Sequence, residues 1–340
     1  MVSWAEKRKA VDAFIRANIR SHPRNITRLT QERFQLSRPA VMMYINDLIS
    51  KRAIEVIGAT KDREYKPLSV LQKDSSYFIS NQLAEDRIWK EFSELAIDFT
   101  DNVRNICQFG FTEIVNNAIE HSDGKKLDIS MDVFFDLVQI RISDDGVGIF
   151  NKIQKEFQLD NPKESILELS KGKLTTNSEL HSGQGIFFTS RMFDTFSILS
   201  DGIGFIHTQS GSDVIDRVES VNKGTKVIME IALTSTRTTI EVFDEYADVD
   251  DGFELTTVPV HLAISGKELL VSRSQARRIL ARFDKFKRVT LDFEKVTQIG
   301  QGFADEIFRV YKREHPETEI VWVNASNEIE NMIKNVKTNN

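Results

Sequence analysis

The chain has 340 residues, 40% of them hydrophobic, and a formal net charge of −6, which suits two or three domains with substantial cores. It contains no long apolar run and no hydrophobic N-terminal region, so neither a membrane span nor a secretion signal is expected, and we predict a cytoplasmic location. The single cysteine, Cys107, excludes an internal disulfide, and the six scattered histidines lack the spacing of a zinc site.

The first part of the chain differs in charge from the rest. Residues 1–66 contain 14 Lys and Arg against 7 Asp and Glu, whereas the remaining residues contain 31 against 44. The balance is therefore +7 in one part and −13 in the other. This asymmetry indicates that the N-terminal segment has an electrostatic role of its own.

The N-terminal segment is predicted to form three helices and a two-stranded hairpin. The expected elements are helices at 5–22, 26–34 and 38–50 and strands at 53–58 and 63–68. Ser37 suits the N-cap of the third helix, and Pro39 suits its first turn. A basic turn separates the two strands.

This order of elements resembles a winged helix-turn-helix domain. The resemblance implies DNA as a partner, with the helix at 38–50 in the major groove and Arg38 and Tyr44 as candidate base contacts. Lys61 and Arg63 in the wing would contact phosphate groups. The alternative is a small basic helical module for protein contacts.

The segment 111–121, FTEIVNNAIEH, carries the most informative pattern of the chain. Glu113 and Asn117 are four residues apart and therefore share one face of a predicted helix. A carboxylate in that position can orient water or a hydroxyl group for attack on a phosphate, and an amide oxygen suits Mg²⁺. Taken alone, the pair also fits an ordinary solvated helix face.

Two predicted antiparallel strands follow, at 127–133 and 137–143. The second strand runs into Asp144, Gly146 and Gly148. A carboxylate at a strand end can accept the amino hydrogens of adenine, and glycines let the backbone approach a flat base closely.

Two further segments complete the pattern. Gly183, Gln184 and Gly185 open an apolar-periodic run, so their backbone N–H groups would lie at a helix N-terminus, where phosphate oxygens bind well. Thr225 precedes a predicted strand at 226–233 and places a hydroxyl group where it could reach the base.

From about residue 85 to residue 233 the chain resembles the Bergerat-fold ATPases of the GHKL superfamily. The passage at 174–194, LTTNSELHSGQGIFFTSRMFD, is most similar to the anti-sigma-factor serine kinases. Histidine kinases usually carry a further glycine where His181 stands, which is a departure at the lid hinge. We expect residues 150–182 to form a mobile lid, with an ordinary long surface loop as the alternative.

The resemblance implies ATP and Mg²⁺ as cofactors and assigns the site residues. Glu113 would be the general base, Asn117 the magnesium ligand, and Asp144 the adenine contact. The other residues implied to contact ATP are Gly146 and Gly148 at the base, Gly183, Gln184 and Gly185 at the phosphates, and Thr225 beside adenine.

The last third of the chain alternates strands and helices. An acidic connection is expected at 238–254. The strands are expected at 258–265, 267–271, 288–296 and 318–325, and the helices at 272–286 and 301–315.

Residues 289–308, VTLDFEKVTQIGQGFADEIF, resemble the STAS fold of the anti-anti-sigma partners, and specifically its STAS-like variants. In that family the phosphorylated serine lies in an Asp-Ser-Ser-Gly turn, but residues 299–302 of this chain are Ile-Gly-Gln-Gly. The phosphorylation switch is therefore expected to be missing. The nearest hydroxyl group belongs to Thr297, for which a structural role at the strand end is favoured.

These observations predict a multidomain α+β protein. We expect a winged helix-turn-helix domain at 1–70, a polar linker at 71–84, a Bergerat-fold α/β sandwich at 85–235 and a STAS-like α/β domain at 236–340.

The favoured function is an ATP-binding, ATP-hydrolysing regulator, in which the nucleotide and the lid alter contacts with the STAS-like domain and so the presentation or dimerisation of the winged helix. One alternative is a serine/threonine protein kinase of the anti-sigma-factor type that acts on a separate partner. A second is a nucleotide-sensing scaffold. Protein contacts through the STAS-like domain and assembly as a homodimer stay open.

Overall fold

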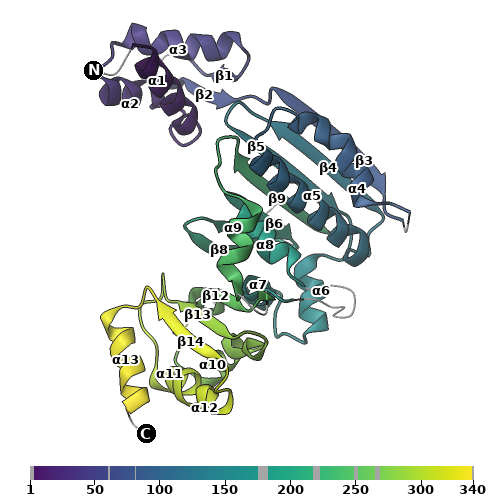
Figure 1. Cartoon of the computed structure of the whole chain (residues 1–340), viewed down its shortest axis with the longest axis vertical. Coiled ribbons are helices and arrows are strands. Elements are labelled where there is room, and N and C mark those ends of the chain that lie inside the picture. Colours follow the sequence, from purple (N-terminus) through teal and green to yellow (C-terminus); the bar gives the residue numbers. More distant parts are fainter. Residues whose placement is uncertain are drawn as a thin grey trace.

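The computed structural model arranges the chain as three bodies in sequence order, from the N-terminal helices to the C-terminal sheet (Figure 1). It describes residues 4–59, 62–80, 82–174, 183–216, 223–248, 252–264 and 269–338. Within these residues, no helix is long and apolar enough to cross a membrane.

The N-terminal body contains the elements that the sequence predicts. They are α1 (Trp4–Asn18), α2 (Ile26–Phe34), α3 (Arg38–Ser50) and the antiparallel strands β1 (Ile54–Ile57) and β2 (Glu64–Pro67). The hydroxyl group of Ser37 accepts a hydrogen bond from the N–H group of Ala40 (3.4 Å) and so caps α3 as expected. The body has its own cluster of buried apolar residues, formed by Val11, Ile15, Ile19, Ile26, Val41, Ile45, Leu48, Ala53, Ile54 and Tyr65.

The central body is built on a sheet in which, within the described residues, seven strands pair antiparallel in the order β3-β4-β5-β9-β6-β7-β8. Their bounds are β3 Leu71–Phe78, β4 Lys126–Val133, β5 Leu137–Asp144, β6 Thr195–Ser200, β7 Ile203–Thr208, β8 Gly211–Asp216 and β9 Thr225–Ala232. The predictions for β4 and β5 are confirmed.

The prediction of a linker at 71–84 is wrong for residues 71–78. Residues 71–78 form the edge strand β3, which pairs with β4 from Leu71 opposite Val133 to Phe78 opposite Lys126. The sequence pattern did not predict this strand, because its side chains are mostly exposed and polar and the usual alternation of apolar and polar residues is missing.

Helices cover one face of the central sheet. These are α4 (Glu85–Phe92), the 3₁₀ turn Ser93–Ala96, α5 (Asp101–His121), α8 (Gly185–Met192) and α9 (Thr239–Tyr246). Buried residues of adjacent strands lie side by side on that face; Ile142, for example, pairs with Ile129 of β4 and Val227 of β9. The result is the two-layer α/β sandwich that the sequence predicts.

Helix α9 lies within the stretch expected to be a connection at 238–254. It packs on the helical layer through Phe243, whose ring is 5.5 Å from that of Phe109 and 4.5 Å from that of Phe188. The boundary of the central body is therefore later than residue 235. The sequence suggested a connection here because α9 is short and rich in acidic residues.

The stretch expected to be a lid contains two helices, α6 (Ile149–Glu156) and α7 (Glu164–Lys171). The alternative of an ordinary surface loop is therefore wrong for residues 150–174. Residues 175–182, which include His181, lie outside the described part of the chain.

The C-terminal body contains a parallel sheet with the order β12-β13-β14 in its described part. Its elements are β12 (Leu255–Pro259), the 3₁₀ turns Val260–Ala263 and Phe283–Lys285, α10 (Arg273–Leu280), β13 (Arg288–Asp292), α11 (Gln301–Asp305), a π-helical turn (Glu306–Tyr311), α12 (Lys312–Glu314), β14 (Glu319–Val323) and α13 (Asn327–Thr338). A short pairing of β10 (Ala247–Asp248) with β11 (Gly252–Phe253) precedes it.

Two strand predictions in this body need correction. The strand expected at 258–265 begins and ends earlier, because a 3₁₀ turn follows Pro259. The strand expected at 267–271 is reduced, in its described part, to one bridge between Leu270 and Ile299. Helix α13 was not predicted.

The N-terminal body is attached to the central sheet in two ways. The N–H group of Leu68 donates to the carbonyl of Ala53 (2.9 Å), and the N–H group of Val70 donates to the carbonyl of Val133 (2.7 Å), so the connection is bonded on both sides of Ser69. In addition, Arg20 forms an ion pair of 2.7 Å with Asp136 in the turn between β4 and β5.

Helix α5 approaches α8 closely at Gly110, where a Cβ atom would overlap the ring of Phe193. Alanine usually stabilises a helix interior by about 0.5–1 kcal/mol relative to glycine. Gly110→Ala should do the opposite and destabilise the protein by about 1–3 kcal/mol, because it overpacks the core. The measurement is the urea midpoint followed by circular dichroism.

The matched control is Asn105→Ala on the exposed side of the same helix, which should leave the midpoint unchanged or raise it. An equal response of the two variants would contradict the close packing of α5 on α8.

Candidate functional site

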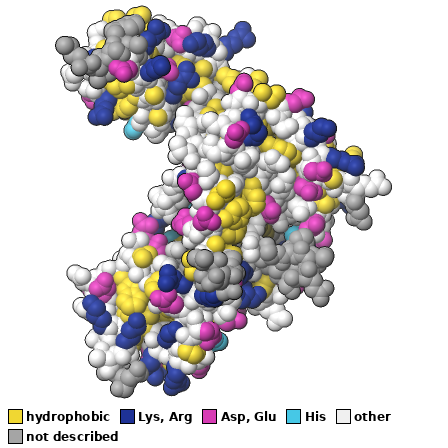
Figure 2. Space-filling model, in the orientation of Figure 1, with side chains coloured by type: hydrophobic (Ala, Val, Ile, Leu, Met, Phe, Trp, Pro, Cys, Tyr) yellow, Lys and Arg dark blue, Asp and Glu magenta, His cyan; other side chains and the backbone are white. Residues whose placement is uncertain are grey.

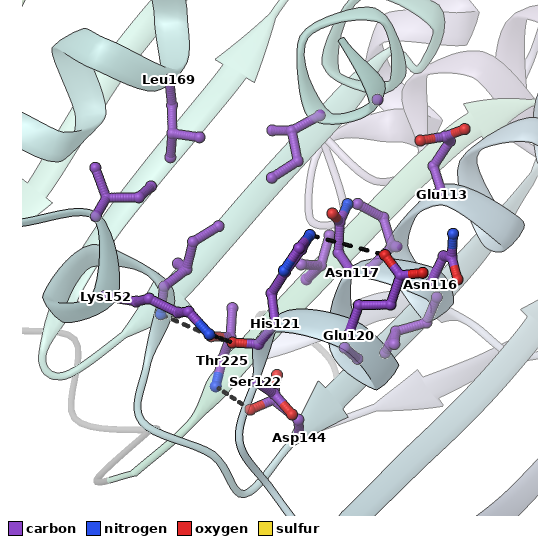
Figure 3. A pocket seen from close by; sticks show the side chains of 18 of the residues that line it. Glu113, Asn116, Asn117, Glu120, His121, Ser122, Asp144, Lys152, Leu169 and Thr225 are labelled. Atoms are coloured by element: carbon purple, nitrogen blue, oxygen red, sulfur yellow. Dashed lines mark hydrogen bonds and ion pairs between the residues drawn. The ribbon is translucent and has the colours of Figure 1, made fainter. Parts of the chain in front are cut away.

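A cavity of ≈ 310 Å³ lies beside the C-terminal half of α5, the ends of β5 and β9, helix α6 and the beginning of α8 (Figure 3). Its polar lining side chains are Glu113, Asn116, Asn117, Glu120, His121, Ser122, Asp144, Lys152, Gln184 and Thr225, and Gly148, Gly183 and Gly185 line it with backbone. Of the residues proposed for ATP, only Gly146 does not line the cavity.

Helix α5 presents one polar face to the cavity. Its buried face consists of Phe111, Ile114, Val115 and Ala118, which hold it against the sheet. Glu113 and Asn117 therefore lie together on the cavity side, as their spacing predicts. Glu120 and His121 continue the same face one turn later, and the same spacing rule could have identified them. Figure 3 shows Asn117 and His121 between Glu113 and Asp144.

Asp144 is held at the end of β5 by backbone donors. Its Oδ1 atom accepts hydrogen bonds from the N–H groups of Gly146 (2.9 Å) and Thr225 (3.3 Å). Burial raises the pKa of the Asp144 carboxyl above its usual value, and these two hydrogen bonds partly offset that effect. The carboxylate keeps acceptor capacity for a ligand, because each of its oxygens has more than one lone pair.

The glycines around Asp144 are required by space and by backbone conformation. A Cβ atom at Gly146 would overlap the carbonyl oxygen of Ser122, so Gly146 brings the end of α5 against the end of β5 rather than lining the cavity. Gly148 has φ = +84°, which favours glycine, and a Cβ atom there would overlap the carboxylate of Asp201.

Thr225 connects the end of β5 to the start of α6. Its N–H group donates to Asp144, and its hydroxyl oxygen accepts a hydrogen bond from the N–H group of Ile149 (3.0 Å) at the start of α6. The hydroxyl hydrogen of Thr225 is thus available to donate to a neighbouring acceptor.

Gly185 is the first residue of α8, and its backbone lies against Glu113. A Cβ atom at this position would overlap the Glu113 carboxylate, so a larger residue would have to displace that carboxylate. Gly183 has φ = +66°, and its carbonyl accepts a hydrogen bond from the N–H group of Leu174 (3.1 Å). The N-terminal N–H groups of α8 and the proposed base therefore meet at one edge of the cavity.

Lys152 on α6 is a cavity residue that the sequence did not reveal. Its ammonium group donates to the carbonyl of His121 (2.7 Å) and to Asp123 (3.1 Å), so it ties α6 to the end of α5. The Nε2 atom of His121 lies 3.8 Å from the Glu120 carboxylate. Nothing in the spacing of Lys152 marks it as a site residue, because the contact depends on how α6 folds back.

A metal site made of protein side chains alone is not found among the described residues, since no cluster of three or more His, Cys, Asp or Glu side chains is placed to hold an ion. Glu113 and Asn117 do offer hard oxygen atoms to the cavity. This donor set fits Mg²⁺ only if ligand oxygens and water complete the coordination.

The candidate DNA contacts lie far from the cavity, on the N-terminal body. Arg38 and Arg63 are exposed, whereas Tyr44 is half-buried against the core of this body. Met43 on α3 is 74% exposed. Lys61 lies outside the described residues.

Comparison with known families identifies two parts of the chain. Residues 85–206 match the histidine kinase-like ATPase domain, and residues 275–330 match a STAS-like domain of unknown function (DUF4325). No curated protein matches the chain. These matches confirm the ATPase and STAS-like parts of the resemblance, whereas the winged helix stays a prediction.

Proposed function

We propose that the cavity binds ATP together with Mg²⁺. The observation that carries this proposal is the convergence of four distant segments on one cavity: Glu113 and Asn117 from α5, Asp144 from β5, Gly183 to Gly185 at α8, and Thr225 from β9. Each segment offers the chemistry that one part of the nucleotide requires. The match of residues 85–206 to the histidine kinase-like ATPase domain supports the same conclusion.

Adenine is assigned to the Asp144 end of the cavity. The carboxylate accepts from the adenine amino group, Thr225 adds a hydroxyl group, and Ile142 and Val227 supply apolar lining. Asp144 needs to be ionised to serve as a pure acceptor; burial raises the pKa of its carboxyl, and the two backbone hydrogen bonds oppose that shift.

The phosphates are assigned to the α8 end. The N–H groups of the first turn of α8, residues 185–187, lack a carbonyl partner within the helix, and the helix dipole favours negative charge there. Glu113 and Glu120 also line the cavity, so a bare polyphosphate would be repelled. Mg²⁺ held by the Asn117 amide oxygen and the phosphates would remove that repulsion.

Glu113 is assigned the role of general base. It lies beside the helix N-terminus that would hold the terminal phosphate, where a carboxylate can take a proton from water or from a hydroxyl group. Water as acceptor gives ATP hydrolysis, and a partner's hydroxyl group gives a protein kinase. We propose hydrolysis, because the STAS-like turn within this chain, Ile299 to Gly302, offers no serine.

The N-terminal body is proposed to bind DNA under the control of the nucleotide. Its order of three helices and a hairpin supports the winged-helix hypothesis, and Figure 2 shows Lys and Arg side chains on its surface. Strand β5 begins next to Asp136, which pairs with Arg20 of that body, and ends at Asp144 in the cavity. This strand is the route that we propose between the N-terminal body and the cavity.

Asp144→Asn should weaken ATP binding. An amide nitrogen cannot accept from the adenine amino group, and a buried unpaired polar group costs about 1–3 kcal/mol, or about 5- to 150-fold in Kd. Calorimetric titration measures the change. The matched control is Asp145→Asn, since the neighbouring carboxylate accepts from the N–H groups of Lys125 and Lys126 outside the cavity. Unchanged affinity in the Asp144 variant would remove this residue from the site.

Glu113→Ala should separate binding from chemistry. ATP and Mg²⁺ should still bind, whereas release of phosphate should slow by about 10²–10⁴-fold, the usual contribution of a positioned general base. Asn117→Ala should instead weaken the Mg²⁺-dependent part of binding. Glu120→Gln, a cavity residue on the same helix that lies next to His121, serves as the control and should keep its turnover. Normal turnover of the Glu113 variant would refute its assignment as base.

Binding of duplex DNA by the full chain should fall steeply as salt is raised, because each neutralised phosphate releases counterions. Replacing Lys61 and Arg63 should reduce the slope of log K against log salt by about 0.9 per lost phosphate contact. Replacing Arg38 or Tyr44 should alter sequence preference, and ATP should shift the affinity of the full chain.

Gel-shift titrations measure these effects, with Arg313→Ala on the C-terminal body as the control for loss of one exposed positive charge. Salt-independent or undetectable binding at low ionic strength would leave the N-terminal body as a protein-interaction module.

A further inference from the structure

Helix α7 is buried on every side, which is unusual for a helix in a segment expected to cover an active site. Residues 165–171 are all buried, and none is more than 6% exposed. A surface helix normally buries one stripe and leaves the opposite face in water. A helix buried all round lies in a core, and here α7 is packed against α6 and α8 of the central body and against β12 and the turn Val260–Ala263 of the C-terminal body.

One side of α7 faces the cavity. Leu169 lines it, and so does Leu174, which follows the helix and donates its N–H group to the carbonyl of Gly183 (3.1 Å). Leu169 and Leu174 therefore form part of the cavity wall, and Leu174 also holds Gly183, which lies just before α8. A displacement of α7 would open this wall.

The other side of α7 packs on the C-terminal body as if it belonged to that fold. The hydroxyl group of Thr256 in β12 donates to the carbonyl of Lys171 (2.7 Å). The ammonium group of Lys171 is fully buried and donates to the carbonyls of Arg278 (3.1 Å) and Ala281 (3.0 Å), where α10 ends. It also pairs with Glu168 (2.6 Å).

Arginines of the C-terminal body complete the contact. Arg278 pairs with Glu164 (2.8 Å), and Arg282 pairs with Glu168 (2.8 Å) and also donates to the carbonyl of Gly172. Lys173 then pairs with Glu254 (2.8 Å). We call α7 and the residues up to Lys173, with these partners, the clamp.

Each charged side chain of the clamp has a partner of opposite charge. Burial lowers the pKa of Lys171 to about 8, and the adjacent Glu168 opposes this effect. A charged group buried to this extent is tolerated only while its partners stay in place, so separation of the two bodies would expose or orphan several charges together. The structure holds the clamp in its docked arrangement, with all of these pairs formed together.

We propose that the STAS-like domain retains the nucleotide by holding α7 and Leu174 against the cavity, so that docking of this domain and nucleotide binding strengthen each other. The proposal rests on the assignment of the cavity to ATP. Because linked equilibria are reciprocal, release of the clamp speeds nucleotide dissociation, and nucleotide in turn stabilises the docked C-terminal body.

The test uses the full chain and the pair Glu164 and Arg278, which is only partly buried, with 15% and 35% of the side chains exposed. Arg278→Glu places two carboxylates together and should speed release of a fluorescent ATP analogue by about fivefold or more, the lower end of common coupling factors. Adding Glu164→Gln should restore part of the rate, because it removes the repulsion and supplies an amide N–H group that can donate to the carboxylate at position 278.

The control variant is Arg288→Glu, which breaks the exposed pair with Glu319 inside the C-terminal body and should leave the release rate unchanged. Hydrogen exchange of the unaltered chain gives a second measurement, since nucleotide should slow exchange in α10. Unchanged or slower release from the Arg278 variant, or exchange in α10 that is indifferent to nucleotide, would overturn the clamp. Failure of the unaltered chain to bind the nucleotide would overturn the assignment of the cavity as well.

Discussion

Partial burial of the Asp144 carboxylate is the constraint on which the site depends. A carboxylate that is partly withdrawn from water must be given hydrogen-bond donors, and here they come from the backbone of Gly146 and Thr225. This requirement fixes where β5 ends and where β9 begins. Gly224 allows it, because it has φ = +81° and a Cβ atom there would overlap the Asp144 carbonyl. The end of α5 and the start of α6 are then brought to the same point through Ser122 and Ile149.

The proposed site could be anticipated largely from sequence because its determinants are local. The spacing of Glu113 and Asn117 sets a helix face, and glycines beside Asp144 and before α8 mark places where only small residues fit. Lys152 escaped because its role depends on a tertiary contact with the end of α5. The pairing of β3 with β4 and the packing of α9 on α5 and α8 are also tertiary contacts, and for that reason polar or acidic composition suggested linkers at both.

Domain limits drawn from sequence also fail at α7. The helix lies within the central body in the chain, between α6 and α8, yet its side chains and carbonyls pair with β12 and α10 of the C-terminal body. Strand β9 shows the reverse case, since it lies beyond the matched residues 85–206 and still occupies an inner position of the central sheet. Contacts, rather than sequence order, define the working units of this protein.

The connection between the N-terminal body and the sheet has a mechanical consequence. Leu68 is bonded back to Ala53 and Val70 is bonded to Val133, so Ser69 is the one residue of this connection between two fixed points. Strand β3 starts directly afterwards, at Leu71. A long flexible linker would let the N-terminal body move independently of the sheet, whereas so short a connection transmits a rotation of the sheet to that body. A molecule bound to the N-terminal body is therefore expected to move together with the sheet that carries the cavity.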